Sequence, residues 1–169
     1  ARPVRDFFIE NAVHWVRDYG FDGLRLDAVH AILDESSPHL VREIARRIGQ
    51  AAGPGRTVFL LLENEDNTAR LLEPEADGTP GATAQWNDDF HNALHVLLTG
   101  ERDGYYADFT DDPAARLARA LAEGFVYQGE PSSLRDGRPR GEPSAHLPVT
   151  AFVNFAQNHD QVGNRVFGE

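Results

Sequence analysis

The stretch "TVFLLLEN", residues 57–64, decides the fold. It places an uninterrupted apolar run, Val58 to Leu62, directly before the acidic residue Glu63. A continuous run of this kind is typical of a strand buried on both faces, as strands are in a parallel sheet. The acid that follows it is therefore expected at the carboxyl end of a buried strand.

Strand patterns recur on both sides of this run. In "GLRLD", residues 23–27, the apolar Leu24 and Leu26 alternate with Arg25 and Asp27, which is the period of a strand. The other predicted strand segments are a short extended piece in "QWNDDF" (85–90) and the last clear strand, "VTAFVNFAQNHD" (149–160).

Helical patterns separate these strands, and turn residues limit them. The predicted helices begin near Pro3, at Ser37-Pro38, at Asn87 or Asp88, and at Asp112-Pro113; they end at Gly20, "AGPG" (52–55), Gly100 and Gly124. The third helix is expected to turn four apolar residues inward: Phe90, Leu94, Leu97 and Leu98. Residues 69–84 and 128–148 are predicted to be loops because they are rich in Pro, Gly and charged residues.

Strands that alternate with helices predict an α/β fold with parallel strands. Part of a (β/α)8 TIM barrel and an open doubly wound sheet both fit this order of elements. The chain has neither the glycine-rich fingerprint of dinucleotide-binding folds nor a GxxxxGK phosphate loop, so the barrel is favoured. We expect residues 1–169 to be a segment of one catalytic barrel domain.

The composition limits the class of partner. The net charge is −11, and all 16 cationic side chains are Arg, which argues against nucleic acid or an anionic membrane and fits a neutral substrate. Cys and Met are absent, no apolar run approaches the roughly 20 residues of a membrane span, and no signal peptide is evident. We therefore expect a cytoplasmic piece of a longer protein, and its oligomeric state stays open.

Three predicted strands end in an acid: Asp27, Glu63 and Asp160. Any one of them alone would more often be a helix cap or a surface residue. Three carboxylates at the carboxyl ends of parallel strands, where α/β barrels place their active sites, favour a common site.

Two carboxyl groups that face each other can hydrolyse a glycosidic bond, one ionised and one protonated. Arg25 should point to the same side of its strand as Asp27, and would then orient that acid and favour its charged form. The alternative is a plain buried ion pair. Glu63 follows an apolar run, so its surroundings should be dry, which suits a general acid; the alternative is a cap for the following turn.

The segments "GFDGLRLDAVHAI" (20–32), "FLLLEN" (59–64) and "FVNFAQNHDQVGNR" (152–165) resemble three sequence regions of the α-amylase family of retaining glycoside hydrolases. The segment "AQWNDDFHNALHVLLTGERDGYYADF" (84–109) is similar to one subgroup, the malto-oligosyltrehalose trehalohydrolases. The resemblance implies that the chain covers roughly strands 4 to 7 of the barrel. A further family region, which carries an Asn-His pair, is missing from the chain.

The resemblance also implies roles for individual residues. Asp27 would be the nucleophile and Glu63 the general acid and then base. Asp160, assisted by His159, would stabilise the transition state by binding sugar hydroxyls, and Arg25 would hold Asp27.

Further substrate contacts follow from the same resemblance. His30 stands where many amylases have a Lys-His pair, a departure that the trehalohydrolase subgroup shares. Trp86 and Asp88 would line sugar subsites, although core packing is an equal alternative for Trp86.

The implied reaction is hydrolysis of the α-1,4 bond next to the terminal trehalose of maltooligosyl-trehalose or a related α-glucan. It requires no cofactor and no metal. Alternatives are another family enzyme, an α-amylase or glucan branching enzyme, and a catalytically inactive carbohydrate-binding homologue. Because the family region with the Asn-His pair is missing, we expect this piece alone to be inactive.

His91 and His95 lie four residues apart, which is the spacing of zinc ligands on a helix. The segment "HNALH" lacks the Glu that follows the first His in zinc hydrolases, and no third ligand is evident. Packing on a helix face is therefore the favoured interpretation.

Overall fold

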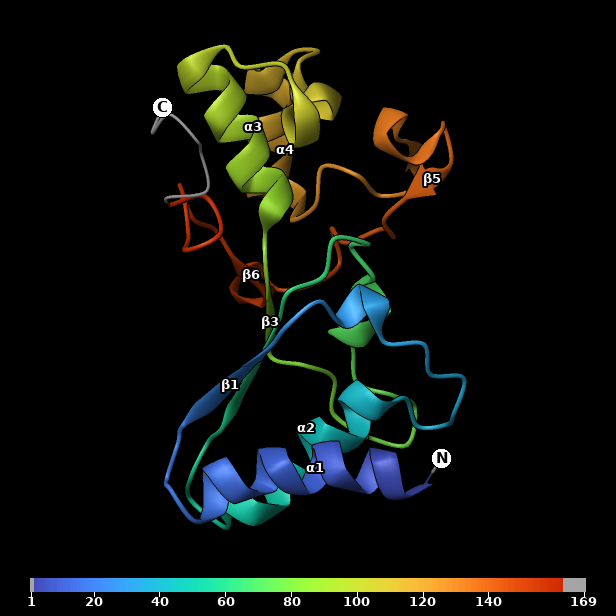
Figure 1. Cartoon of the computed structure of the whole chain (residues 1–169), viewed down its shortest axis with the longest axis vertical. Helices are drawn as coiled ribbons and strands as arrows, with labels where there is room; N and C mark the ends of the chain where they lie inside the picture. Colours follow the sequence, from blue (N-terminus) through green and yellow to red (C-terminus); the bar gives the residue numbers. More distant parts are fainter. Residues whose placement is uncertain (1, 163–169) are drawn as a thin grey trace. The chain divides into compact units, whose positions relative to one another are not determined.

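The computed structural model describes residues 2–162 of the 169-residue chain. The chain forms two compact units, Ala1–Gln85 and Trp86–Glu169 (Figure 1). The single barrel domain stays a prediction.

Parallel strands run through the first unit. Strand β1 (Gly23–Leu26) pairs with β2 (Phe59–Leu62), and β2 pairs with β3 (Ala84–Trp86), both in parallel. Leu26 lies opposite Leu62, and Leu62 lies opposite Gln85, so the strands end at one edge. This arrangement confirms the α/β fold with parallel strands, while the closed barrel stays a prediction.

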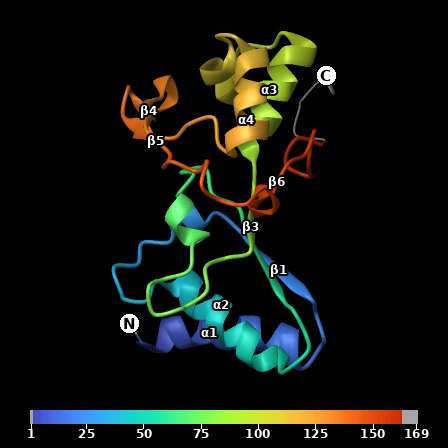
Figure 2. The ribbon, with the colours of Figure 1, turned by 180° about the vertical axis from the view of Figure 1, so that it is seen from behind.

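Helices α1 (Arg2–Arg17) and α2 (Leu40–Ala52) lie side by side in both views (Figures 1 and 2). Each buries one apolar stripe at helical spacing. The buried apolar residues are Ile9, Ala12, Val13 and Val16 of α1 and Val41, Ile44, Ala45 and Ile48 of α2. Phe8 and Trp15, which share the periodic pattern of α1, lie on its exposed side.

The predicted ends of α2 are correct to within two or three residues. The helix begins at Leu40 rather than at Ser37, because the Nδ1 atom of His39 accepts a hydrogen bond from the Val41 amide and caps the first turn. It ends at Gly53, whose φ of +76° suits glycine.

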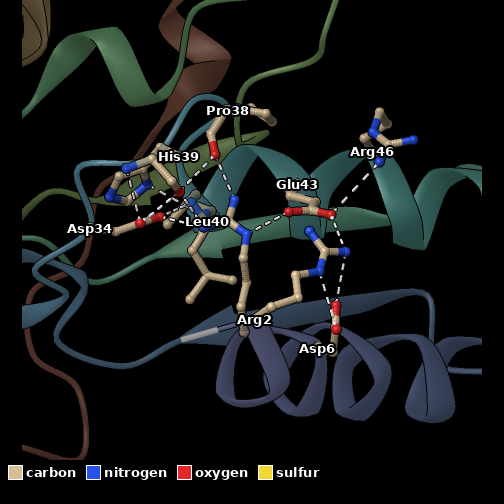
Figure 3. A network of polar contacts seen from close by, with 11 residues as sticks. Arg2, Asp6, Asp34, Pro38, His39, Leu40, Glu43 and Arg46 are labelled. Carbon is tan, nitrogen blue, oxygen red and sulfur yellow. Dashed lines mark hydrogen bonds and ion pairs between the residues drawn. The ribbon is translucent and has the colours of Figure 1, made fainter.

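Arg5 binds the loop that precedes α2. Figure 3 labels its partners Asp34, Pro38 and Glu43. Its guanidinium donates to Glu43 on α2 at 2.5 Å, to Asp34 at 2.6 Å and to the carbonyl of Pro38 at 2.5 Å. Burial alone would raise the pKa of Asp34, but bonds from Ser36, Arg5 and the Leu40 amide hold it well below its usual value. The bonds of Arg5 therefore connect α1 to both the loop and α2.

In the second unit, α3 (Asp88–Thr99) packs against α4 (Pro113–Glu123). Asn87 caps α3 and Asp112 caps α4, each accepting a hydrogen bond from an amide three residues later. The core between them consists of Ala93, Val96, Tyr106, Phe109, Ala120, Val126 and Tyr127.

The predicted inner face of α3 is partly wrong. Leu97 and Leu98 are 45% and 73% exposed, while Asp89, His91, Ala93 and Val96 are buried. Apolar spacing alone gave the wrong face, because polar side chains on α3 bond to distant backbone and are buried there.

The long strand predicted at 149–160 is also wrong in extent, since β6 covers only Phe152–Val153. The Val153 carbonyl accepts from the Asn87 amide at 3.0 Å. Beyond it, the Asn154 side chain and the Ala156 carbonyl bond to side chains of Asn87 and His91 instead of to a neighbouring strand.

The remaining elements are short. The predicted loop at 128–148 contains a small antiparallel pair, β4 (Glu130–Pro131) with β5 (Pro139–Arg140). Single 3-10 turns are η1 (Val29–Ala31), η2 (Ala69–Leu71), η4 (Ser133–Arg135) and η5 (Val149–Ala151), and η3 (Gly104–Phe109) is longer.

Candidate active site

One guanidinium holds two strand-end acids in the first unit. The Nη1 atom of Arg25 on β1 lies 2.8 Å from Oδ1 of Asp27 and 2.9 Å from Oε2 of Glu63. Arg25 therefore points to the side of Asp27, as the alternation of the strand predicts. The Asp27 side chain is 82% exposed, so this is not a plain buried ion pair.

Glu63 is also bound by the backbone of the neighbouring loop. Its Oε2 accepts from the Ala28 amide at 2.8 Å, and its carbonyl accepts from the Val29 amide at 2.9 Å. The surroundings of the Glu63 carboxylate are thus polar and partly open, not the dry ones that the sequence predicts.

Ala28 adopts a left-handed backbone conformation directly after Asp27, with φ 43° and ψ 49°. This conformation costs an alanine roughly 1 kcal/mol or more, and such strain concentrates at functional sites. Here the unusual turn directs the Ala28 amide at the Glu63 carboxylate.

His30 joins the loops that follow β1 and β2. It lies on η1, and its Nδ1 accepts from the Glu65 amide at 3.4 Å. His30 is therefore close to the backbone that follows Glu63.

The second unit brings together Trp86, His159 and Asp160. The Trp86 ring lies 5.9 Å from the His159 ring and 5.8 Å from that of Phe155, while Nε2 of His159 lies 3.3 Å from Oδ1 of Asp160. The side chains of His159 and Asp160 are 65% and 46% exposed, so both are open to a ligand.

The stretch that carries these residues forms a tight turn. The Asp160 amide donates to Oδ1 of Asn158, and the Asn158 amide donates to Oε1 of Gln161. Asp88 is the half-buried first residue of α3. The segment 152–165, which resembles a region of the α-amylase family, ends in residues 163–165, and these lie outside the described residues.

The predicted site residues thus fall into two sets. Arg25, Asp27, His30 and Glu63 lie together in the first unit. Trp86, His159 and Asp160 lie together in the second unit.

The sequence did not reveal three buried polar residues at the start of α3: Asn87, Asp89 and His91. Asn87 Nδ2 donates to the Gly124 carbonyl at 2.8 Å and to Oδ1 of Asn154 at 2.9 Å. Asp89 accepts from the amides of Val126 and Tyr127 and pairs with Arg140 at 2.8 Å. The sequence signal that could have indicated them is the polar residue at positions 87, 89 and 91 of "NDDFH" (87–91).

Three buried amides beside the first set were also missed: Asn64, Asn67 and Gln85. Gln85 Nε2 donates to the Asn64 carbonyl at 3.0 Å and to Oδ1 of Asn67 at 3.3 Å. They fix the loop that follows Glu63.

The helical histidines of α3 are engaged in packing. His95 Nε2 lies 2.7 Å from a carboxylate oxygen of Glu101, and its ring stacks on Tyr106 at 4.0 Å. Within residues 2–162, no three His, Cys, Asp or Glu side chains are grouped so that they could hold a metal ion.

None of the described helices is both long and apolar enough to span a bilayer.

Comparison with known proteins gives relatives that include several malto-oligosyltrehalose trehalohydrolases. The chain is 45% identical to the malto-oligosyltrehalose trehalohydrolase of Arthrobacter ramosus over 168 residues, and 45% identical to that of Rhizobium sp. (strain M-11) over 170 residues. Each alignment covers 98% of this chain but only 29% and 28% of the relative, so the chain spans less than a third of their length.

A solved structure agrees with these relatives. A Salmonella typhimurium protein described as a "Putative alpha Amylase" matches 98% of this chain and 28% of its own, with a TM-score of 0.89 and 50% identity. No protein-family model matches the chain.

Proposed function

We propose that this chain, a homologue of the malto-oligosyltrehalose trehalohydrolases over almost all of its length, is a catalytic segment of a retaining glycoside hydrolase with a (β/α)8 barrel. The full-length enzyme cleaves the α-1,4 bond next to the terminal trehalose of maltooligosyl-trehalose and releases trehalose. The observation that carries the proposal is the pair of strand-end carboxylates on one guanidinium of Arg25.

Arg25 brings one oxygen of each carboxylate close together, which is compatible with a retaining pair. Because Asp27 Oδ1 and Glu63 Oε2 both lie within hydrogen-bond distance of Nη1 of Arg25, their separation cannot exceed the sum of those two short distances. Retaining glycosidases hold their carboxyl groups about 5–5.5 Å apart, whereas inverting enzymes need roughly 6.5–9.5 Å to admit a water.

In the proposed reaction, ionised Asp27 attacks the anomeric carbon while Glu63 protonates the departing glycosidic oxygen of trehalose. The carbon–oxygen bond to trehalose breaks as the bond to Asp27 forms. Glu63 then takes a proton from water, and the resulting oxygen attacks the anomeric carbon and displaces Asp27. Two inversions restore the α configuration.

The second set of residues is assigned to sugar binding. Asp160 and His159 are exposed beside each other and bind sugar hydroxyls near the reacting carbon. The Trp86 ring beside His159 offers an apolar face for a sugar ring. Asp88 and His30 are assigned as further substrate-binding residues, each within its own unit.

A second candidate is an α-amylase, because the Salmonella protein that is 50% identical over 98% of this chain carries that description. A glucan branching enzyme would use the same two carboxylates. A catalytically inactive homologue is disfavoured because Asp27, Glu63 and Asp160 are all present. A cytoplasmic location stays a prediction.

Product analysis of the full-length protein decides among these enzymes. We expect maltotriosyl-trehalose to give free trehalose and maltotriose by mass spectrometry, and maltopentaose of equal length to react far more slowly. Equal shortening of both substrates would indicate an α-amylase, and new α-1,6 linkages would indicate a branching enzyme. The 169-residue chain alone is expected to release no trehalose.

The anomeric configuration tests the retaining mechanism separately. Proton NMR in the first minutes should show the new reducing end as the α anomer, before mutarotation. A β anomer at early times would rule out Asp27 as the nucleophile.

A further inference from the structure

His91 makes a specific bond to the segment that leads from β6 into the second set of site residues. It lies on α3 with 3% of its surface exposed, and its Nδ1 is 2.6 Å from the carbonyl oxygen of Ala156. A carbonyl oxygen only accepts, so Nδ1 carries the proton. Ala156 immediately precedes the segment Gln157–Asp160, which carries the candidate sugar-binding residues.

The other ring nitrogen of His91 is left without a partner. Its Nε2 is buried and has no hydrogen-bond partner among the described residues. Burial lowers the pKa of His91, against the opposing effect of the Ala156 carbonyl, so the ring is neutral and Nε2 carries a lone pair. Nδ1 therefore makes a hydrogen bond, while Nε2 is buried without one.

Ring contacts provide a second connection to the same segment. The His91 ring stacks on Phe155 at 5.5 Å with an interplanar angle of 11°. Phe155 lies 5.8 Å from Trp86, and Trp86 lies 5.9 Å from His159. His91 thus contacts both residues, Phe155 and Ala156, that precede the polar segment.

Packing alone does not account for a histidine at this position. A buried polar atom without a partner costs about 1–3 kcal/mol, which an apolar side chain of similar size would avoid. The contact that requires an imidazole is the bond from Nδ1 to the Ala156 carbonyl.

We propose that His91 is a positioning residue, which fixes the Ala156 carbonyl and thereby the direction of the segment that carries His159 and Asp160. Its effect on turnover rests on the proposed function, whereas its effect on the segment 157–162 does not. His91 itself touches no substrate.

The test compares two variants of the full-length protein. His91→Leu removes the donor, while His91→Asn keeps an amide N–H at the position of Nδ1. With maltotriosyl-trehalose, we expect His91→Leu to lower kcat/KM by about 10–100-fold through misplaced sugar contacts, and His91→Asn to recover most of it. His95→Leu, on the same helix but paired with Glu101, is the matched control and should have little effect.

Hydrogen exchange gives a readout that does not depend on the reaction. Amides of residues 157–162 should exchange faster in His91→Leu than in wild type, and at nearly the wild-type rate in His91→Asn and His95→Leu. Nitrogen-15 NMR of wild type should show a neutral ring protonated on Nδ1.

Three outcomes would overturn the proposal: an Nε2-protonated ring, unchanged exchange and kinetics in His91→Leu, or equal losses in both His91 variants that follow only their denaturation midpoints. If His91→Leu does not fold, the NMR result and the His91→Asn exchange decide. If wild type releases no trehalose, the proposed function is wrong. The exchange data would still test whether His91 fixes the segment 157–162.

Discussion

The two units hold their candidate site residues by different means. In the first unit, a cation and backbone amides bind the carboxylates themselves, as Arg25 and Ala28 do for Glu63. In the second unit, His159 and Asp160 stand exposed, and buried side chains of α3 fix the backbone that precedes them. Direct binding fixes the carboxylates themselves, whereas the buried anchors fix the backbone that precedes the exposed residues.

This difference suits the proposed roles. A nucleophile and a general acid must be held at a fixed distance from the reacting bond, while residues that bind sugar hydroxyls need the correct direction and access. The following changes test the contrast, from the largest expected effect to the smallest.

Asp27→Asn in the full-length protein should lower kcat by roughly 10⁴-fold or more, since it removes the proposed nucleophile. The denaturation midpoint should hardly change, because the side chain is 82% exposed. Steady-state kinetics and urea denaturation measure the two effects. Asp22→Asn is the matched control, an exposed acid paired with Arg56 away from the site. Most of the activity surviving in Asp27→Asn would refute the assignment.

Asp89→Asn should have the opposite profile, a large loss of stability. Asp89 is fully buried, pairs with buried Arg140 and accepts from two amides, so breaking the pair should cost about 3–5 kcal/mol in urea denaturation. Glu123→Gln, which alters an exposed pair with Arg119, should cost at most about 1 kcal/mol. Equal effects of the two changes would contradict the role of Asp89 as a buried anchor.

Each unit contains one histidine whose pKa is lowered by burial, His39 in the first and His91 in the second. At a pH below 6.5, the ordinary pKa of histidine, these two side chains bind protons in the unfolded chain more readily than in the folded chain. The free energy of unfolding should therefore fall as the pH drops through and below 6.5, and stay constant above it. Urea denaturation at about pH 7.5 and about pH 5.5 measures the loss.

Variants assign this pH dependence to each unit. His39→Asn keeps a side-chain cap for α2, and His91→Asn keeps a donor to Ala156, but neither side chain titrates. Each should reduce the difference between the two pH values, and the double variant should reduce it most. A full wild-type dependence in the double variant would exclude both histidines as its source.

The smallest effect concerns the strained turn of the first unit. Ala28→Gly should raise the free energy of unfolding by roughly 0.5–1 kcal/mol, because glycine adopts the left-handed conformation without strain. Ala118→Gly, on the exposed side of α4, should lower it by about 1 kcal/mol. Destabilisation by both changes would show that Ala28 is not strained.

The elements that the sequence predicts well depend on local physics. The apolar run before Glu63 and the alternation around Arg25 predict β1 and β2, and Asp112-Pro113 with Gly124 limits α4. Side-chain alternation also predicts that Arg25 lies beside Asp27. In each case, the cause lies within a few residues of its effect.

The failures involve partners that are distant in the sequence. Asp89 is buried because of Val126, Tyr127 and Arg140, and no local pattern indicates that they meet. The strand at 149–160 is cut short because His91 takes the carbonyl of Ala156. Ala28 is left-handed, although alanine seldom is, in the turn whose amide bonds to Glu63, 35 residues away in the sequence.

The ring contact between Trp86 and His159 also makes the second unit optically observable. Trp86 is one of two tryptophans in the chain, and its indole lies 5.9 Å from the imidazole. A sugar ring bound against the indole would displace water from its face and change its emission. In a Trp15→Phe background, the emission of Trp86 would report binding without any attached dye.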